Sequence, residues 1–136
     1  MRNLIFYKEL KNKKIDVVLV FAKYDNKWVL CKHKARDTLE VCGGHVEKDE
    51  SIYQAAEREL YEESGAIAKN IQLVGYLSKN VNNSRQYAAV FVVEVDKIEQ
   101  LPNYEMSEII LLKEFPLNTT YPETYSKLLK IVGSRL

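Results

Sequence analysis

The sequence lacks the features that mark secreted, membrane-spanning and nucleic-acid-binding proteins. It has only two cysteines, Cys31 and Cys42, and no apolar run approaches membrane-spanning length. Its first segment, MRNLIFYKELKNKK, contains no signal-peptide core. We therefore expect reduced thiols, a cytoplasmic location and no membrane partner. The net charge of +1 gives no electrostatic basis for binding nucleic acid.

No linker, internal repeat or low-complexity segment divides the chain. Its 136 residues are enough for one domain with a substantial core. The content of 46% hydrophobic and 29% charged residues is ordinary for a soluble protein. We therefore expect a single domain over residues 1–136.

The stretch GGHVEKDESIYQAAERELYEESGA, residues 43–66, carries the strongest pattern in the chain. Its glycine pair predicts a turn, and a helix follows. Ser51 suits the N-cap of this helix, and Gln54 completes a capping box. Gly65 suits the left-handed position just past the last turn.

Acidic residues fall on the helix face that should be buried. At about 100° per residue, Glu59 and Glu63 share a stripe with Ala56, and Glu62 lies beside Glu59. Carboxylates on a buried face are uncommon unless they are paired or bind metal, and a solvated acidic surface does not account for this stripe. Mg²⁺ or Mn²⁺ would resolve the conflict, because these ions prefer carboxylate and carbonyl oxygens. The predicted metal ligands are the Gly43 carbonyl and the side chains of Glu59, Glu62 and Glu63.

The charged and glycine positions of this stretch resemble the Nudix box. The matching positions are Gly44, Glu50, Arg58-Glu59-Leu60, Glu62-Glu63, Gly65 and the small apolar Ala66. The resemblance implies the Nudix hydrolase family, with a domain that takes up nearly the whole chain. The chain departs from the family at Cys42, where proline is usual, and at Ala66, where a bulky aliphatic residue is usual. Neither departure removes a charged group.

The order of apolar runs predicts a mixed β-sheet between helices. Strands are expected at residues 4–7, 15–21, 27–31, 39–42, 71–78, 86–95 and 108–115. A turn is expected at Asp25-Asn26, polar loops at 32–38, 79–85 and 97–107, and a second helix at 119–136 with Pro122 in its first turn. This order predicts an α/β fold of the α+β type, and the resemblance implies the same α/β/α sandwich.

The expected chemistry is hydrolysis of a phosphoanhydride. That reaction needs an activated water, neutralised charge and a held leaving group, and divalent ions held by carboxylates supply all three. Glu50 would contribute through a water or by fixing the loop. The resemblance implies that Arg58 orients a box carboxylate and that a residue outside the box adds a base or ligand. Glu105 is the predicted residue, and Glu108 is the alternative.

The expected substrate-binding residues are a basic loop and one asparagine. Lys32, Lys34 and Arg36 precede the acidic stretch and suit a polyphosphate, although a solvated surface loop is the alternative. The segment HKARDTLEVCGGHVE is similar to bacterial nucleoside triphosphate pyrophosphohydrolases of the MutT type, which include enzymes that clear 8-oxo-dGTP. The segment 115–118 resembles a MutT segment whose asparagine, here Asn118, reads the purine; a turn or cap at Asn118 is the alternative.

The predicted reaction is hydrolysis of a nucleoside triphosphate, oxidised purine nucleotides included, to the monophosphate and pyrophosphate. Alternative substrates are ADP-ribose, NADH and dinucleoside polyphosphates. ADP-ribose-cleaving members tend to carry a proline shortly past the box, and none occurs here between Ala66 and Pro102. A nucleotide sensor without activity is a further alternative, but sensors commonly lose box glutamates and this chain has them all.

The cysteines and histidines allow one other metal site. Cys31-x-His33 and Cys42-x-x-His45 supply four residues of the kinds that bind zinc. Their spacing matches no usual zinc finger. Cys31 also ends an expected strand, where a small core residue is the stronger prediction.

Overall fold

The computed structural model describes residues 3–100 and 106–135, which form one mixed β-sheet with two α-helices. The elements are β1 (Ile5–Tyr7), β2 (Val17–Tyr24), β3 (Lys27–His33), β4 (Leu39–Glu40), β5 (Cys42–His45), α1 (Ile52–Ser64), β6 (Ala66–Val81), β7 (Ser84–Ile98), β8 (Met106–Leu112), α2 (Pro122–Val132) and a 3₁₀ turn, Gly133–Arg135. The strand order is β1-β6-β7-β2-β3-β4, with β5 paired to β2 and β8 paired to β3. The β2–β7 pair is parallel and the other pairs are antiparallel, so the sheet is mixed as expected.

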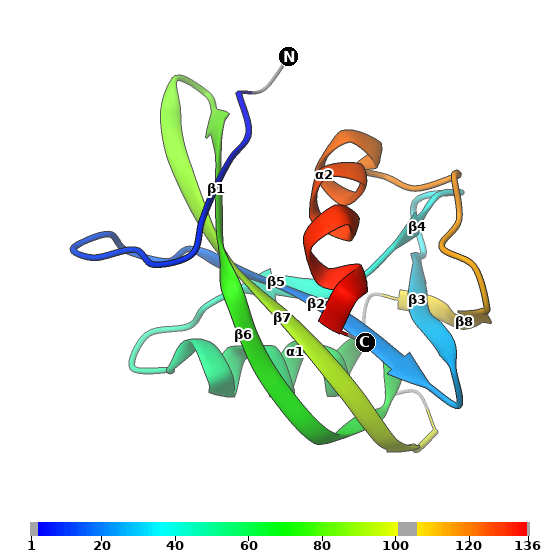
Figure 1. Cartoon of the computed structure of the whole chain (residues 1–136). Coiled ribbons are helices and arrows are strands. Elements are labelled where there is room, and N and C mark those ends of the chain that lie inside the picture. Colours follow the sequence, from blue (N-terminus) through cyan, green and yellow to red (C-terminus); the bar gives the residue numbers. More distant parts are fainter. Residues whose placement is uncertain (1–2, 101–105, 136) are drawn as a thin grey trace.

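The two helices cover opposite faces of the sheet (Figure 1). On β2, the fully buried Val20 belongs to a core cluster with Leu60 of α1. The next residue, Phe21, belongs to a second cluster with Tyr125 of α2. Successive side chains of a strand point to opposite faces, so β2 lies between both helix layers. This arrangement confirms the expected α/β/α sandwich.

The first helix has the ends that the sequence predicts. Ser51 caps α1, with its Oγ accepting from Gln54 N at 3.0 Å and its own N donating to Gln54 Oε1 at 2.8 Å. Gly65 follows the helix with φ of 75°, and its N–H donates to the Tyr61 carbonyl. These local bonds fix where α1 begins and ends, and therefore which of its residues face the sheet.

The glycine pair lies in a strand, and the predicted turn is wrong. Gly43 and Gly44 both belong to β5 and pair with β2. A Cβ added at Gly43 would collide with the Val18 carbonyl oxygen, and a Cβ added at Gly44 would collide with the Glu59 carboxylate. The glycines are therefore required because β5 approaches β2 and α1 closely.

The loop predicted at residues 79–85 is also wrong, because β6 and β7 form one long hairpin (Figure 1). Pairing continues to Val81 and Ser84, and only Asn82 and Asn83 turn the chain, with φ of 50° and 65°. Asparagine tolerates the left-handed conformation that a two-residue hairpin turn needs. The turn predicted at Asp25-Asn26 is confirmed, with φ of 51° and 62°.

The last two elements are shorter than predicted. The strand β8 ends at Leu112, which pairs with Trp28 near the start of β3. Phe115 packs instead against Trp28, with ring centroids 5.4 Å apart. The helix α2 starts at Pro122 as expected but ends at Val132.

Candidate active site

A groove beside α1 gathers most of the carboxylates that the sequence identifies. Ala55, Ala56, Leu60 and Ser64 are the buried residues of α1. The glutamates flank this buried face, and the side chains of Glu59 and Glu62 are 13% and 33% exposed. We call this feature the carboxylate groove. It is lined by Gly43, Gly44, His45, Glu47, Arg58, Glu59, Glu62 and Glu63.

Arg58 links the acidic residues around this groove. Its guanidinium donates two hydrogen bonds to Glu50, Nε to Oε2 at 2.6 Å and Nη2 to Oε1 at 3.0 Å. Its Nη1 lies 3.1 Å from Glu59 Oε2 and 3.3 Å from Glu62 Oε1. Its Nη2 also donates to the His45 carbonyl at 2.9 Å. The arginine therefore joins α1 to the segment that precedes it and limits how the box carboxylates can turn.

These contacts change the ionisation of Glu50. The hydrogen bonds from Arg58 hold the pKa of the Glu50 carboxyl below its ordinary value, and a bond from Glu47 N acts in the same direction. The hydrogen bonds to Glu50 in turn raise the pKa of Arg58. Glu50 is therefore an anion that faces Arg58, and it does not line the carboxylate groove as described. This position suits the role of fixing the loop.

Glu63 lies against the glycine strand. Its Oε1 accepts a hydrogen bond from Gly43 N at 2.8 Å, so the carboxylate is fixed at one end of the groove. Gly43 also lines the groove. The part that its carbonyl oxygen plays stays a prediction.

The composition of the groove fits a hard divalent cation. Among its described lining residues, Arg58 is the one cation beside Glu47, Glu59, Glu62 and Glu63. Carboxylates that share a partly buried groove repel one another, and a divalent cation relieves that repulsion. Glu105 lies outside the described residues. Glu108 is exposed on β8, opposite Lys32 of β3, and β8 contacts α1.

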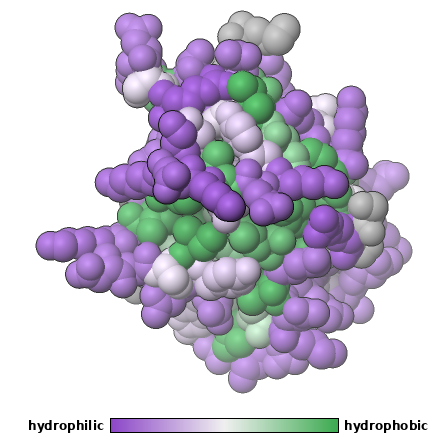
Figure 2. Space-filling view, turned by 60° about the vertical axis from the view of Figure 1, so that its left-hand side comes forward, coloured by the Kyte–Doolittle hydropathy of each residue, from purple (hydrophilic) through white to green (hydrophobic). Residues whose placement is uncertain are grey.

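A second hollow, which we call the apolar cleft, lies between α2, the β6–β7 hairpin and β2. Its apolar lining includes Leu19, Val41, Leu77 and Ala88. Its polar lining residues are Glu40, Lys79, Gln86, Tyr121 and Thr124, of which Glu40 and Thr124 are buried. The Lys79 Nζ lies 5.0 Å from the centroid of the Tyr121 ring. Figure 2 shows hydrophobic surface gathered in the middle of one face of the molecule, with hydrophilic side chains around it.

The groove and the cleft meet at β5. Gly43, Gly44 and His45 line both of them. Tyr125 closes the inner end of the cleft, where its hydroxyl accepts a hydrogen bond from Val41 N at 3.2 Å. Burial raises the pKa of this tyrosine, so its hydroxyl stays neutral. The two hollows therefore share one strand, with the groove beside α1 and the cleft beside α2.

Comparison with known proteins identifies this arrangement. A family model described as the NUDIX domain matches residues 13–130. The chain belongs to the Nudix hydrolase family. Enzymes of this family act on phosphoanhydride bonds, and they generally use divalent metal cations.

A curated relative and several solved structures are similar to this Nudix hydrolase. The chain is 29% identical over 114 residues to "Putative 8-oxo-dGTP diphosphatase YtkD" of Bacillus subtilis (strain 168), covering 83% of this chain and 72% of the relative. The pyrophosphohydrolase BsRppH of Bacillus subtilis superposes with a TM-score of 0.78 at 22% identity, covering 93% and 89% of the two chains. A MutT Nudix hydrolase of Burkholderia pseudomallei superposes with a TM-score of 0.70 at 17% identity, covering 88% and 99%. At these identities the structural matches support the fold.

The predicted substrate-binding residues of the Nudix hydrolase are not among the described lining residues of either hollow, and Arg36 contacts the cleft through Glu40. Lys34 and Arg36 are exposed in the β3–β4 loop, and Arg36 Nη1 bonds Glu40 Oε2 at 2.7 Å. Lys32 Nζ lies 3.9 Å from Asp37 Oδ1. Asn118 is exposed, and its Nδ2 donates to the Asp37 carbonyl at 3.3 Å. None of these four described residues lines the groove or the cleft.

Sequence reasoning did not identify the residues of the apolar cleft. They come from β2, β4, β5, β6, β7 and α2, together with Val41 and Tyr121, and only Gly43, Gly44 and His45 of them lie in the box stretch. The aromatic residue before Pro122, which is Tyr121, was the one local signal, because a ring at the start of an amphipathic helix has few places to pack.

The cysteines and histidines considered as zinc ligands do not come together as the sequence suggests. Among the described residues, the Cys31 and Cys42 thiols lie near the Glu63 carboxylate, in a group that includes neither histidine. Both cysteines are free and fully buried. His33 accepts a hydrogen bond from Ala35 N instead. Neither described helix is long and apolar enough to cross a membrane.

Proposed function

We propose that this Nudix hydrolase cleaves a nucleoside triphosphate of the 8-oxo-dGTP type to the monophosphate and pyrophosphate. The observation that carries the proposal is the junction of the two hollows at β5. A triphosphate can face the carboxylate groove while the attached base enters the apolar cleft. The name of the curated Bacillus subtilis relative supports the same substrate class.

In this proposal the carboxylate groove holds the divalent cation, Mg²⁺ or Mn²⁺. Glu59, Glu62 and Glu63 would supply carboxylate oxygens, with the Gly43 carbonyl as a further ligand. A bound divalent cation neutralises charge on the phosphates and lowers the pKa of water. Arg58 is a positioning residue, because it contacts Glu59 and Glu62 and is itself held by Glu50.

A carboxylate outside the box would accept a proton from the attacking water. Glu105 is the proposed residue, in the segment just before β8, and Glu108 on β8 is its competitor. The contact between β8 and α1 supports a contribution from this part of the chain. Separate Glu105→Gln and Glu108→Gln variants distinguish the two, because only the residue that accepts the proton should alter the acidic limb of the kcat profile against pH.

The apolar cleft would hold the base. Tyr121 offers a ring for stacking, and Lys79, Gln86 and Glu40 are polar residues of the same lining. Stacking on an aromatic side chain contributes about 1–3 kcal/mol per base. The polar groups can distinguish one base from another through its donors and acceptors.

A side-by-side substrate comparison tests the proposal. We would measure kcat/KM for 8-oxo-dGTP, the standard dNTPs, ADP-ribose, NADH and dinucleoside polyphosphates, each with Mg²⁺, Mn²⁺ or EDTA. The expected result is preferred cleavage of a nucleoside triphosphate, release of pyrophosphate and loss of activity in EDTA. A preference for ADP-ribose or a dinucleotide would refute the triphosphate assignment, and binding of nucleotide without turnover would support a sensor.

A further inference from the structure

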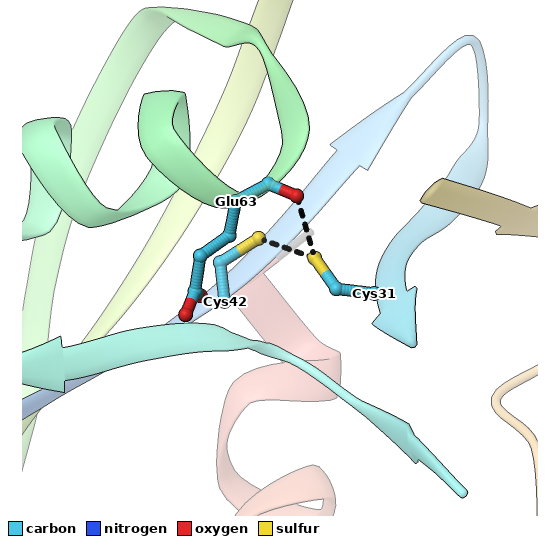
Figure 3. A group of neighbouring side chains, drawn as sticks. All are labelled: Cys31, Cys42 and Glu63. Atoms are coloured by element: carbon cyan, nitrogen blue, oxygen red, sulfur yellow. Dashed lines mark hydrogen bonds between the residues drawn. The ribbon is translucent and has the colours of Figure 1, made fainter. Parts of the chain in front are cut away.

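Two buried thiols and a groove carboxylate come together behind the carboxylate groove. Cys31 projects from β3, Cys42 from β5 and Glu63 from the last turn of α1 (Figure 3). The two sulfur atoms are 3.1 Å apart, and the two Sγ atoms and a Glu63 carboxylate oxygen lie within 4.8 Å of one another. Cys31 Sγ also lies 3.4 Å from the Glu63 carbonyl oxygen. Three separate elements, β3, β5 and α1, thus bring two soft sulfur atoms and one hard oxygen atom to one point.

The two cysteines are close but not bonded. A disulfide bond is about 2.05 Å long, so sulfur atoms 3.1 Å apart belong to free thiols. Both residues have no exposed surface, whereas Glu63 is partly exposed and lines the carboxylate groove. An ion that enters the groove therefore reaches Glu63 first and the thiols behind it second.

We propose that Cys31, Cys42 and Glu63 form a second cation site, which takes a thiophilic divalent cation such as Zn²⁺ or Cd²⁺. Both thiols lose a proton to solvent on binding, so two thiolates and one carboxylate hold the ion. Thiolate sulfur selects such ions over Mg²⁺, which prefers oxygen ligands. Three protein ligands leave the fourth position of a tetrahedral site for water.

The geometry needs a small adjustment to hold such an ion. With Zn–S distances of about 2.3 Å and tetrahedral angles, the two sulfur atoms would lie about 3.8 Å apart. The observed separation of 3.1 Å must therefore widen by roughly 0.7 Å. Rotation of the two side chains about χ1 can supply this change without moving the strands.

The site would compete with the activating cation, because both use Glu63. This consequence rests on the proposed function, in which Glu63 holds Mg²⁺ or Mn²⁺. When a thiophilic ion takes the Glu63 carboxylate, the groove loses one of its ligands. We therefore expect Zn²⁺ to inhibit the Mg²⁺-supported reaction, because it would bind at Cys31 and Cys42 and take Glu63 from the groove.

The binding test is a Cd²⁺ titration of the full, reduced, metal-free chain, followed by the ultraviolet thiolate-to-cadmium charge-transfer band. Because the chain has only two cysteines, this band reports only Cys31 and Cys42. The expected result for the wild type is saturation at one equivalent. Cys31→Ser, which keeps the side-chain volume, should weaken binding by more than about 100-fold. Glu57→Gln, on the exposed side of α1, is the matched control and should bind as the wild type does.

Two results would refute the cation site: no charge-transfer band in the wild type, or equal Cd²⁺ affinity in the wild type and Cys31→Ser. A circular dichroism melt of each variant shows whether it is folded. If Cys31→Ser does not fold, Glu63→Gln takes its place, and it should weaken Cd²⁺ binding while the thiolate band remains. Unchanged Cd²⁺ affinity in Glu63→Gln would exclude the carboxylate from the site.

A second measurement tests the competition separately from the proposed function. Zn²⁺ is added to the Mg²⁺-loaded wild type and to Cys31→Ser during nucleotide hydrolysis. Strong inhibition of the wild type alone supports competition through the cysteines, and equal inhibition of both refutes it. A chain that shows the charge-transfer band but hydrolyses no nucleotide would keep the cation site and overturn the proposed function. A chain that hydrolyses the nucleotide but shows no charge-transfer band would keep the proposed function and refute the cation site.

Discussion

The carboxylate groove and the apolar cleft share β5 but differ in how they are built. Apart from β5, the groove is lined by side chains between Glu47 and Glu63, so a single loop and helix supplies them. The cleft is lined by side chains of β2, β6, β7 and α2 as well, and most of them are apolar. The groove concentrates negative charge around one arginine, whereas the cleft offers apolar walls with a polar edge.

This difference separates two tasks. A charged groove acts on the charge that develops during the reaction, and such interactions change kcat. In the proposed function the apolar cleft would hold the base equally in the ground state and the transition state, and such interactions change KM. Substitutions in the two regions should therefore have different kinetic signatures, which the following predictions test.

The largest effect is expected for Glu63→Gln. Loss of the carboxylate charge should lower kcat by about 10²–10³-fold, because charge stabilisation is a large catalytic term. Without metal the stability should stay level or rise by about 0.3–1 kcal/mol, since a negative charge leaves the last helical turn. The amide oxygen can still accept the bond from Gly43 N. Steady-state kinetics and thermal unfolding in EDTA measure both quantities.

Glu57→Gln is the control for this prediction, because Glu57 is exposed on the same helix. It should change neither kcat nor the unfolding temperature. Full activity of Glu63→Gln would show that Glu63 is not a ligand of the activating cation. Unfolding of Glu63→Gln alone would show that the residue serves the fold.

Substitution of the neighbouring glycines should separate activity from folding. In Gly44→Ala the new methyl group displaces the Glu59 carboxylate, a flexible side-chain end, so kcat should fall by about 100-fold with little change in stability. In Gly43→Ala the methyl group strikes the Val18 carbonyl of the backbone, so stability should fall by about 1–3 kcal/mol. Kinetics and denaturant unfolding of both variants measure this difference. Loss of stability in Gly44→Ala together with loss of kcat alone in Gly43→Ala would contradict the close contacts at β5.

In the apolar cleft, Tyr121→Ala should raise KM by about tenfold and leave kcat nearly unchanged. The aromatic ring is the proposed stacking surface, and its hydroxyl is not required for stacking. Tyr121→Phe, which keeps the ring, should therefore resemble the wild type. A large fall in kcat with unchanged KM would remove the distinction between groove and cleft.

The free energy of unfolding at acidic pH should depend on the contact between Glu50 and Arg58. Because the pKa of Glu50 is lower in the folded chain, this contact stabilises the fold above the ordinary carboxyl pKa, and the contribution is lost as pH falls through the folded value. Glu50→Gln should therefore be less stable than the wild type at neutral pH. The difference should narrow below about pH 4.5. Denaturant unfolding at several pH values measures it, and a constant difference would show that ionisation of Glu50 is not the cause.

The smallest effect is expected in the β3–β4 loop. Lys34 is exposed and lines neither hollow as described, so Lys34→Ala should change kcat/KM by less than about twofold. Lys79→Ala removes a cation at the edge of the cleft and should raise KM more. A tenfold fall in kcat/KM for Lys34→Ala would instead support the basic loop as a phosphate-binding element.

The sequence by itself was sufficient for the groove and for most of the elements. The capping box at Ser51, the left-handed Gly65 and the helical spacing of the glutamates are interactions between residues a few positions apart. Such patterns specify a helix and its faces without knowledge of the rest of the chain. The sandwich followed from the order of apolar runs, which also depends on local periodicity.

The sequence was less informative about strand ends and about the reason for the glycines. The segments 79–81 and 84–85, in which only Val81 is apolar, suggest a loop, but they pair with each other in the hairpin. Gly43 and Gly44 read as a turn, but they lie where a strand approaches a carbonyl and a carboxylate. The two errors have different origins. The hairpin pairs, from Lys79 with Gln86 to Val81 with Ser84, are close in sequence, and only their polarity suggested a loop. The close contacts of Gly43 and Gly44 are with Val18 and Glu59, which lie farther away along the chain.

Only the tertiary structure revealed the apolar cleft and the meeting of Cys31, Cys42 and Glu63. Tyr121 and Lys79 are 42 positions apart, yet the packing of α2 on the sheet brings them to one edge. The sequence paired each cysteine with a nearby histidine, whereas the sheet and α1 place both beside a glutamate. Helix periodicity and caps act over a few residues and can be read locally. Strand pairing and helix docking act over the whole chain, so what they bring together appears only when the chain is folded.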